Sequence, residues 1–268
     1  ALAFILENLS LPVILVGAQR SSDRGSTDAA LNLISAAYFI ANSNFAGVAI
    51  CMHENMSDLS SLILPATKTR KMHTSRRDAF RPINAAANAR VDYEAKNISY
   101  LSSYNKRDTS AAARKKLQLR LFNEKIKVGI IKTHTNMFTS EFLAYKGFDG
   151  LVVEGTGLGH LPNEEIDEFT VENKRIFAAV KTLTNSGTVV VMAPQTIYGR
   201  IQLNVYTPQR EIQSIGVLGN LSDMTPETTF IKLAWLLSNY GKSEVKELIT
   251  KNLRGEITER TEPAAFLV

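Results

Sequence analysis

The sequence has few cysteines and histidines, the residues that crosslink a chain or bind metals. Among 268 residues there are one cysteine and four histidines, and tryptophan and proline are also scarce, at one and eight residues. A single cysteine cannot form an intrachain disulfide, and Cys51 lies in the apolar run VAICM, which indicates a core position in a reducing compartment. We therefore expect a cytoplasmic protein that is stabilised by a hydrophobic core, which a chain of this length can bury.

Several functional signatures are also missing. The four histidines are His53, His73, His134 and His160. No two of them are four residues apart and they have no cysteine partners at the spacing of a tetrahedral metal site, so we expect no metal site. No apolar run approaches the roughly 20 residues that span a bilayer, so we expect no membrane association. The G-x-S-x-G elbow of serine hydrolases is absent. The glycine-rich GTGLG at 155–159 lacks the Lys-Ser/Thr of a phosphate loop, which favours a tight loop and no cofactor in this chain.

The charge balance is mildly basic. The formal net charge is +5, and lysines and arginines gather at 68–71, 76–77 and 114–116. Such a balance is compatible with weak attraction to an anionic partner such as RNA, but solvated surface charge is the favoured explanation, because a basic balance of this size is common.

Strand-like apolar runs alternate with helix-like segments along the chain. We expect strands at 12–17, 48–52, 128–132, 150–155 and 188–193, and helices at about 26–41, 139–146 and up to 185. Continuous β-branched runs separated by helices are typical of parallel sheets in α/β proteins. Near the C-terminus, Thr225 and Ser243 are capping-type residues that predict the starts of two further helices.

The apolar pattern lapses between 97 and 125, where the sequence becomes polar and basic. We therefore predict a first domain over 1–105, a linker over 106–124 and a second domain over 125–268.

Two polar stretches directly follow apolar elements, which is where open α/β sheets place their sites. The first is AQRSSDRGSTD at 18–28, and the second is KMHTSRRDAF at 71–80. A simpler interpretation of the second is a basic surface loop in which Asp78 pairs with Arg76 or Arg77.

Both stretches resemble segments of the asparaginase family. VGAQRSSDRGSTDAALNL resembles the family's VGA-x-R segment, and Lys71 stands nine residues before Phe80, as the catalytic lysine does in the family's K-x-H-x-x-x-x-D-A-F segment. FDGLVVEGTGLGHLP and SDMTPETTFIKLAWLLS extend the resemblance over nearly the whole chain. Within the family, RKMHTSRRDAFRPIN and the tail LRGEITER most resemble the glutamine-hydrolysing D subunits of archaeal tRNA-dependent amidotransferases.

The resemblance implies a fold and a set of site residues. The fold is a larger three-layer parallel-sheet domain, truncated at its N-terminus, followed by a smaller flavodoxin-like parallel-sheet domain. Lys71 would end a Thr-Asp-Lys relay that activates a threonine nucleophile. The remaining candidates would bind substrate or order the site: Gly17 and Ala18 through backbone close to the substrate amide, Gln19, Ser26, Asp28 and Asp78. Asn136 would contribute to the pocket of a neighbouring subunit in a homodimer, or else belong to a surface turn.

The family's two threonine motifs are missing, because the sequence begins downstream of both. We therefore expect the isolated chain to be inactive. The implied function is to hydrolyse glutamine and supply ammonia to a partner, the E subunit of the amidotransferase, which uses ATP and Mg to convert Glu-tRNA(Gln) to Gln-tRNA(Gln). Two alternatives are a free cytoplasmic L-asparaginase and, if the chain is complete, a catalytically empty binding module.

Overall fold

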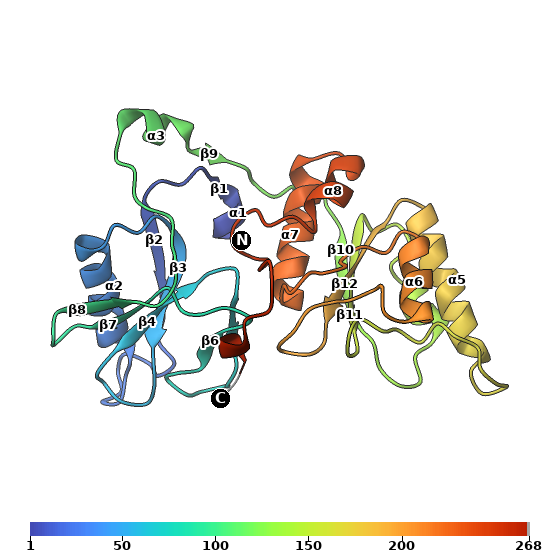
Figure 1. Ribbon diagram of the computed structural model, residues 1–268, viewed down its shortest axis with the longest axis horizontal. Coiled ribbons are helices and arrows are strands. Elements are labelled where there is room, and N and C mark those ends of the chain that lie inside the picture. The colour runs from blue at the N-terminus through green and yellow to red at the C-terminus, as the bar shows by residue number, and fades with distance from the viewer. Residues whose placement is uncertain (267–268) are drawn as a thin grey trace. The chain divides into compact units, whose positions relative to one another are not determined.

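The computed structural model describes residues 1–266, which form two compact units (Figure 1). The N-terminal unit comprises Leu2–Arg120 with the C-terminal residues from Glu262 onward, and the C-terminal unit comprises Leu121–Thr261 with Ala1. The division between the units falls inside the segment 106–124 that we predicted as a linker.

The N-terminal unit is built on a five-stranded sheet in the order β2-β3-β4-β7-β8. Its strands are β2 (Pro12–Val16), β3 (Gly47–His53), β4 (Ser61–Pro65), β7 (Ala89–Asp92) and β8 (Asn97–Tyr100). The long helix α2 (Ala29–Asn42) joins β2 to β3, and α1 (Leu2–Ile5) precedes the short strand β1 (Leu6–Glu7).

This sheet is mixed, whereas we predicted a parallel one. Only β2 and β3 run parallel, and β3/β4, β4/β7 and β7/β8 are antiparallel pairs. For two of these pairs the reason lies in the connection: a parallel pair needs a crossover of a dozen or more residues, and only residues 54–60 separate β3 from β4 and only residues 93–96 separate β7 from β8. The α/β class itself is confirmed.

Both faces of the sheet are buried. On one face Phe39 of α2 packs with alternate strand residues, among them Ala49, Cys51, Ile63 and Val91. On the other face Met52, Leu62, Leu64 and Ala87 form a second cluster. Cys51 is fully buried, as predicted, and burial raises the pKa of its thiol to about 12.

Part of the predicted linker is ordered against the N-terminal unit. Helix α3 (Ala111–Lys116) is capped by Ser110, whose hydroxyl accepts from the Ala113 amide at 3.1 Å. Strand β9 (Gln118–Leu119) then pairs antiparallel with β1, and Arg120 forms an ion pair with Glu7. These contacts assign residues up to Arg120 to the N-terminal unit.

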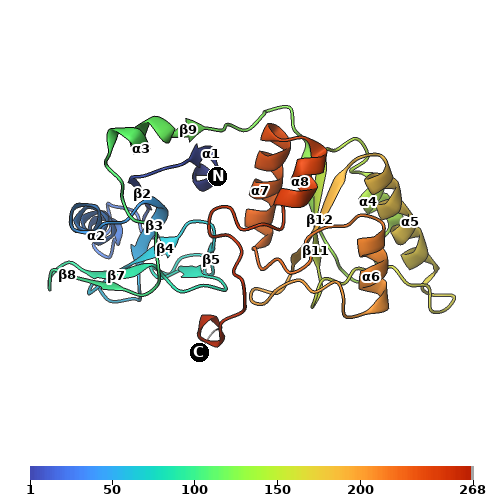
Figure 2. The same cartoon turned by 45° about the horizontal axis from the view of Figure 1, so that its top comes forward.

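The C-terminal unit contains a three-stranded sheet whose strands all run parallel, in the order β10-β11-β12. The strands are β10 (Val128–Lys132), β11 (Gly150–Gly155) and β12 (Val189–Pro194). Helices α4 (Thr139–Leu143), α5 (Val171–Asn185) and α6 (Thr207–Ser214) lie on one side of the sheet, and α7 (Pro226–Asn239) and α8 (Lys242–Leu248) on the other (Figures 1 and 2). A short 3₁₀ helix, η1 (Pro263–Ala265), belongs to the N-terminal unit.

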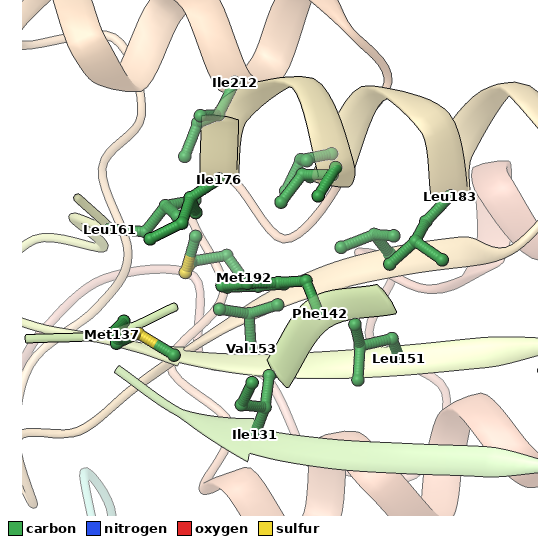
Figure 3. Packing of buried hydrophobic residues seen from close by; sticks show 14 of the residues in the cluster. Ile131, Met137, Phe142, Leu151, Val153, Leu161, Ile176, Leu183, Met192 and Ile212 are labelled. Carbon is green, nitrogen blue, oxygen red and sulfur yellow. The ribbon is translucent and has the colours of Figure 1, made fainter. Parts of the chain in front are cut away.

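The core of this unit lies between the sheet and α5. Phe142, Ile176 and Leu183 from the helices meet Val153 and Met192 from the strands (Figure 3). On the opposite face α7 approaches so closely that a Cβ at Gly150 would lie 2.8 Å from Leu233. Burial on both faces explains why β11 and β12 read as continuous apolar runs.

The two C-terminal helices begin differently from one another. The Thr225 hydroxyl accepts from the Thr228 amide at 3.3 Å and caps α7, as predicted. Helix α8 instead begins at Lys242 after Gly241, so Ser243 lies inside its first turn and is not the cap. The Glu244 carboxylate accepts from the Gly241 amide at 3.1 Å and satisfies this end of the helix.

Gly219 is expected to be intolerant of a side chain. It has φ +106°, and a Cβ there would lie 2.3 Å from the Met192 carbonyl oxygen, in backbone that is held by a 2.8 Å bond from the Met192 amide to Leu218. Because strained φ alone costs about 1–3 kcal/mol, Gly219→Ala should lower the free energy of unfolding by more than that. Urea denaturation followed by fluorescence of Trp235, in the same unit, measures the loss.

Gly199→Ala is the matched control, because Gly199 has φ +100° but no atom within 4 Å of an added Cβ. In Gly199→Ala the free energy of unfolding should fall only by the conformational cost of a positive φ. Equal losses in the two variants would contradict the close-approach argument.

Candidate functional site

Asp28 organises the loop that follows β2. Its carboxylate is fully buried and accepts from the backbone amides of Gln19 at 2.9 Å and Arg20 at 3.0 Å. The side-chain amide of Asn32, one turn into α2, donates to the same carboxylate at 3.1 Å. These bonds tie the start of the loop to the start of the helix, so the loop has a defined path despite its polar composition.

Asn32 connects this loop to β3. Its Nδ2 also donates to the Gly17 carbonyl oxygen at 3.0 Å, and its Oδ1 lies 2.7 Å from Nδ1 of His53. Asn32 and His53 are both fully buried. Two polar side chains that are 21 residues apart in the sequence therefore meet beneath the loop.

Three of the small or hydroxyl residues predicted for the site lie on the surface of the loop. Gly17, Ala18 and Ser26 are exposed, whereas Gln19 is half-buried. A Cβ at Gly17 would find only the Met52 sulfur, at an ordinary 3.9 Å. The packing of this chain therefore does not itself require glycine at position 17.

Lys71 lies on a two-stranded hairpin. It ends β5 (Thr69–Lys71) and pairs with Phe80, the first residue of β6 (Phe80–Pro82). The turn closes through a 2.7 Å bond from the Met72 amide to the Ala79 carbonyl oxygen. The Lys71 side chain is exposed, whereas Lys68, three residues earlier, is buried. The hairpin thus holds the two lysines in different environments.

Asp78 anchors the same hairpin through arginines. Its carboxylate accepts from Arg76 at 2.8 and 2.9 Å and from Arg81 at 2.9 Å. The hydrogen bond from Arg76 lowers the pKa of Asp78, so the carboxylate remains ionised. The ion pair between Asp78 and Arg76, which was one of the two pairings considered from the sequence, is thus present. Arg81 is a second partner of Asp78 that the sequence did not indicate.

Arg77 turns instead toward Asp58, in the loop after β3. It is buried, and it donates to the Asp58 carboxylate and to the Met56 carbonyl oxygen. The other contact of Asp58 is with His53, whose Nε2 lies 3.3 Å from the Asp58 carboxylate. Neither His53 nor Asp58 was singled out in the sequence.

Models of one protein family match both units. The model of the asparaginase N-terminal domain matches residues 1–105, and that of the glutaminase/asparaginase C-terminal domain matches residues 127–249. The chain belongs to the asparaginase family.

Several relatives in this family share more than a third of the sequence. The chain is 41% identical to the D subunit of the glutamyl-tRNA(Gln) amidotransferase of Pyrococcus furiosus, over 100% of this chain and 58% of that protein. The D subunit of Thermococcus kodakarensis is 42% identical, over 100% and 57%, and that of Methanobrevibacter smithii is 38% identical, over the same shares. The chain therefore spans less than three fifths of the length of these relatives.

Solved asparaginases share the fold. The thermostable L-asparaginase of Thermococcus kodakarensis superposes with a TM-score of 0.81 at 24% identity, covering 97% of this chain and 71% of that one. L-asparaginase I of Vibrio cholerae gives 0.78 at 23% identity, covering 96% and 71%. At this level of identity the likeness establishes the fold alone.

Asn136 lies in the C-terminal unit, on an exposed turn after β10. Its φ is 60°, a left-handed conformation that asparagine adopts more readily than most residues. Nearby, the Thr133 hydroxyl donates to the Glu154 carbonyl oxygen at 2.8 Å, and Gln195 donates to that hydroxyl at 2.8 Å. Thr133 and Gln195, which follow β10 and β12, therefore meet the backbone of β11 at the carboxyl end of this sheet.

The glycine-rich stretch at 155–159 and the histidines were the other sequence features considered for a site. GTGLG forms a tight loop, closed by bonds of 3.0 and 2.8 Å between Thr156 and His160, with Gly157 and Gly159 at positive φ. Among residues 1–266, no three His, Cys, Asp or Glu side chains gather to hold a metal ion. In the same range no helix combines the length and apolar composition that a bilayer crossing requires.

Proposed function

We propose that this chain is part of the glutaminase subunit of a tRNA-dependent amidotransferase, which supplies ammonia for converting Glu-tRNA(Gln) to Gln-tRNA(Gln) in the cytoplasm. The observation that carries the proposal is identity of about 40% to D subunits of glutamyl-tRNA(Gln) amidotransferases over the whole chain. The solved L-asparaginases share 23–24%. A free asparaginase is therefore the weaker alternative.

In this proposal Lys71 acts on the proton of a threonine nucleophile that other residues supply. A threonine hydroxyl is a weak nucleophile and needs a base within hydrogen-bonding reach. Lys71 is the last residue of β5 and is exposed at the mouth of a hairpin that Asp78 and its arginines brace. An exposed amine on a braced hairpin can face a nucleophile brought by another segment.

The loop after β2 would bind the glutamine. Gly17 and Ala18 are exposed, and Asp28 holds the neighbouring amides of Gln19 and Arg20 in place. Because the Met52 sulfur, at 3.9 Å, is the only described atom found within 4 Å of a Cβ at the exposed Gly17, a substrate amide can approach the backbone there. Ser26 and Asn136 remain proposed contributors, the latter to a neighbouring subunit of a homodimer.

The partners follow from the same proposal. The E subunit of the amidotransferase would activate the glutamate of the misacylated tRNA with ATP and Mg and receive the ammonia, so tRNA and nucleotide would be bound through the complex. Glutamine would be the small-molecule substrate of this chain.

The proposal predicts an activity that depends on segments outside the 268 residues. The purified chain should release no ammonia from glutamine or asparagine, because it lacks a threonine nucleophile. A longer polypeptide that adds the family's threonine segments should hydrolyse glutamine, measured as glutamate formed. Ammonia release by the short chain that is lost in Lys71→Ala would contradict this division of the site.

The same assay separates the alternatives. A longer polypeptide that prefers asparagine and gives no Gln-tRNA(Gln) with the partner subunit would be a free asparaginase. One that hydrolyses neither amide would be a binding module.

A further inference from the structure

A line of hydrogen bonds joins the two loops of the candidate site. It runs from the backbone of the loop after β2 through Asp28 and Asn32 to His53, and on through Asp58 to Arg77 of the lysine hairpin. His53 is the middle of this line and is fully buried. None of the roles assigned above uses it.

The neighbours of Asn32 fix the tautomer of His53. Asn32 Nδ2 has two hydrogens, and the Gly17 carbonyl oxygen and the Asp28 carboxylate, at 3.0 and 3.1 Å, can only accept them. Asn32 Oδ1 is therefore the atom that faces His53, and it can only accept a hydrogen bond. At 2.7 Å, Nδ1 of His53 must carry the hydrogen.

The other ring nitrogen faces a second acceptor. Nε2 of His53 lies 3.3 Å from a carboxylate oxygen of Asp58, whose pKa is lowered by the hydrogen bond to His53 and by the charge of Arg77. A neutral ring with its hydrogen on Nδ1 would present a lone pair to this carboxylate. Only a ring with a hydrogen on each nitrogen can donate to both Asn32 and Asp58. The other charged groups along the line are Asp28, Asp58 and Arg77.

We propose that His53 is a positioning residue that couples the glutamine-binding loop to the lysine hairpin, with Nδ1 donating to Asn32 and Nε2 donating to Asp58. It touches neither substrate nor nucleophile. Its effect is to fix where Gly17 and Gln19 stand relative to the segment that carries Lys71. The kinetic consequence rests on the proposed glutaminase function, whereas the hydrogen-bond arrangement does not.

The first test observes the ring directly. In the intact polypeptide labelled with ¹⁵N-histidine, long-range ¹H–¹⁵N spectra should show both ring nitrogens of His53 protonated, with His53→Gln assigning the signals. His73 is an internal reference for an unprotonated Nδ1, because its Nδ1 accepts from the amides of Ser75 and Arg76, each at 3.1 Å. A His53 ring that lacks the hydrogen on either nitrogen would overturn the proposal.

The second test is kinetic and uses an exposed residue that is safe for folding. The Asp58 side chain is 71% exposed, and asparagine keeps an oxygen that can accept from the buried Arg77, so Asp58→Asn should leave the melting temperature near that of the wild type. It should lower kcat/KM for glutamine about tenfold, and His53→Phe should lower it about 10²-fold, the loss expected from a displacement of about 1 Å. The double variant should lose no more than His53→Phe alone.

Asp108→Asn is the matched control, an exposed carboxylate of the same unit that should leave kcat/KM unchanged. Wild-type kcat/KM in Asp58→Asn, or strictly additive losses in the double variant, would overturn the positioning role. If the intact polypeptide hydrolyses no amide, the proposed function fails, and the spectrum alone still decides the arrangement around His53.

Discussion

Replacing Lys71 with methionine in the intact polypeptide is expected to lower glutamine hydrolysis about 10²- to 10⁴-fold, the usual contribution of a base that assists proton transfer. Methionine keeps the length of the side chain and removes its amine. Because the side chain is exposed and its backbone pairs with Phe80 in the hairpin, the fold should survive. The loss should appear in kcat, with KM for glutamine little changed.

Added ammonium salt provides a second readout. Ammonia should restore Gln-tRNA(Gln) formation by the Lys71→Met complex, because the partner's amidation step does not use this pocket. Near-normal glutamine-dependent amidation in Lys71→Met would contradict the assignment. So would a failure of ammonia to rescue an intact complex.

The matched control for this variant is Lys106→Met, and not Lys68→Met. Lys68 stands only three residues before Lys71 in the sequence, which would otherwise make it a convenient control. The structure buries Lys68 to 1% exposure, so its loss would mix a folding defect with any catalytic one. Lys106 is exposed in the same unit and should leave kcat unchanged.

The sequence predicts those parts of the fold that have long patterns. The apolar runs of β2, β3, β10, β11 and β12 are visible because each is continuous. Burial on both faces accounts for this in β11 and β12, whereas Leu15 and Val16 of β2 and Ile130 of β10 are exposed. Among the strands it misses, β4 is a buried apolar run, whereas the others are short and partly exposed: in β7, for example, buried Ala89 and Val91 flank exposed Arg90 in an element of four residues. Alternation over so few residues is indistinguishable from a loop.

The candidate site also has parts that the sequence predicts and parts that it does not. Polar loops at strand ends are conspicuous in a sequence, and both candidate loops were found on that basis. The sequence does not predict the link between the two loops, because the link depends on a contact between Asn32 on a helix and His53 on a strand. In the sequence His53 is only one of four scattered histidines, and spacing carries no information about a partner 21 residues away.

In the C-terminal unit, the pair between Lys232 and Glu256 holds the chain that follows α8 against α7. Both side chains have 0% exposure, and Nζ of Lys232 lies 2.7 Å from the Glu256 carboxylate. That carboxylate also accepts from the amides of Leu253 at 3.0 Å and Arg254 at 2.6 Å. Burial lowers the pKa of Lys232, and the charge of Glu256 opposes that shift. The ion pair is therefore shielded from bulk solvent.

Lys232→Met is accordingly expected to lower the free energy of unfolding by about 3–5 kcal/mol, because it leaves the Glu256 charge buried and unpaired. Adding Glu256→Gln should recover part of the loss, since glutamine is neutral and its oxygen still accepts from the two amides. Trp235 is the only tryptophan, is buried in α7 and lies 5.7 Å from the Arg254 guanidinium. Its fluorescence in urea therefore reports on this region.

Lys246→Met, at an exposed position of α8, is the control, and its free energy of unfolding should stay within about 0.5 kcal/mol of the wild type. If Lys232→Met behaved like Lys246→Met, or if Glu256→Gln deepened the loss, an unpaired buried carboxylate could not be its cause.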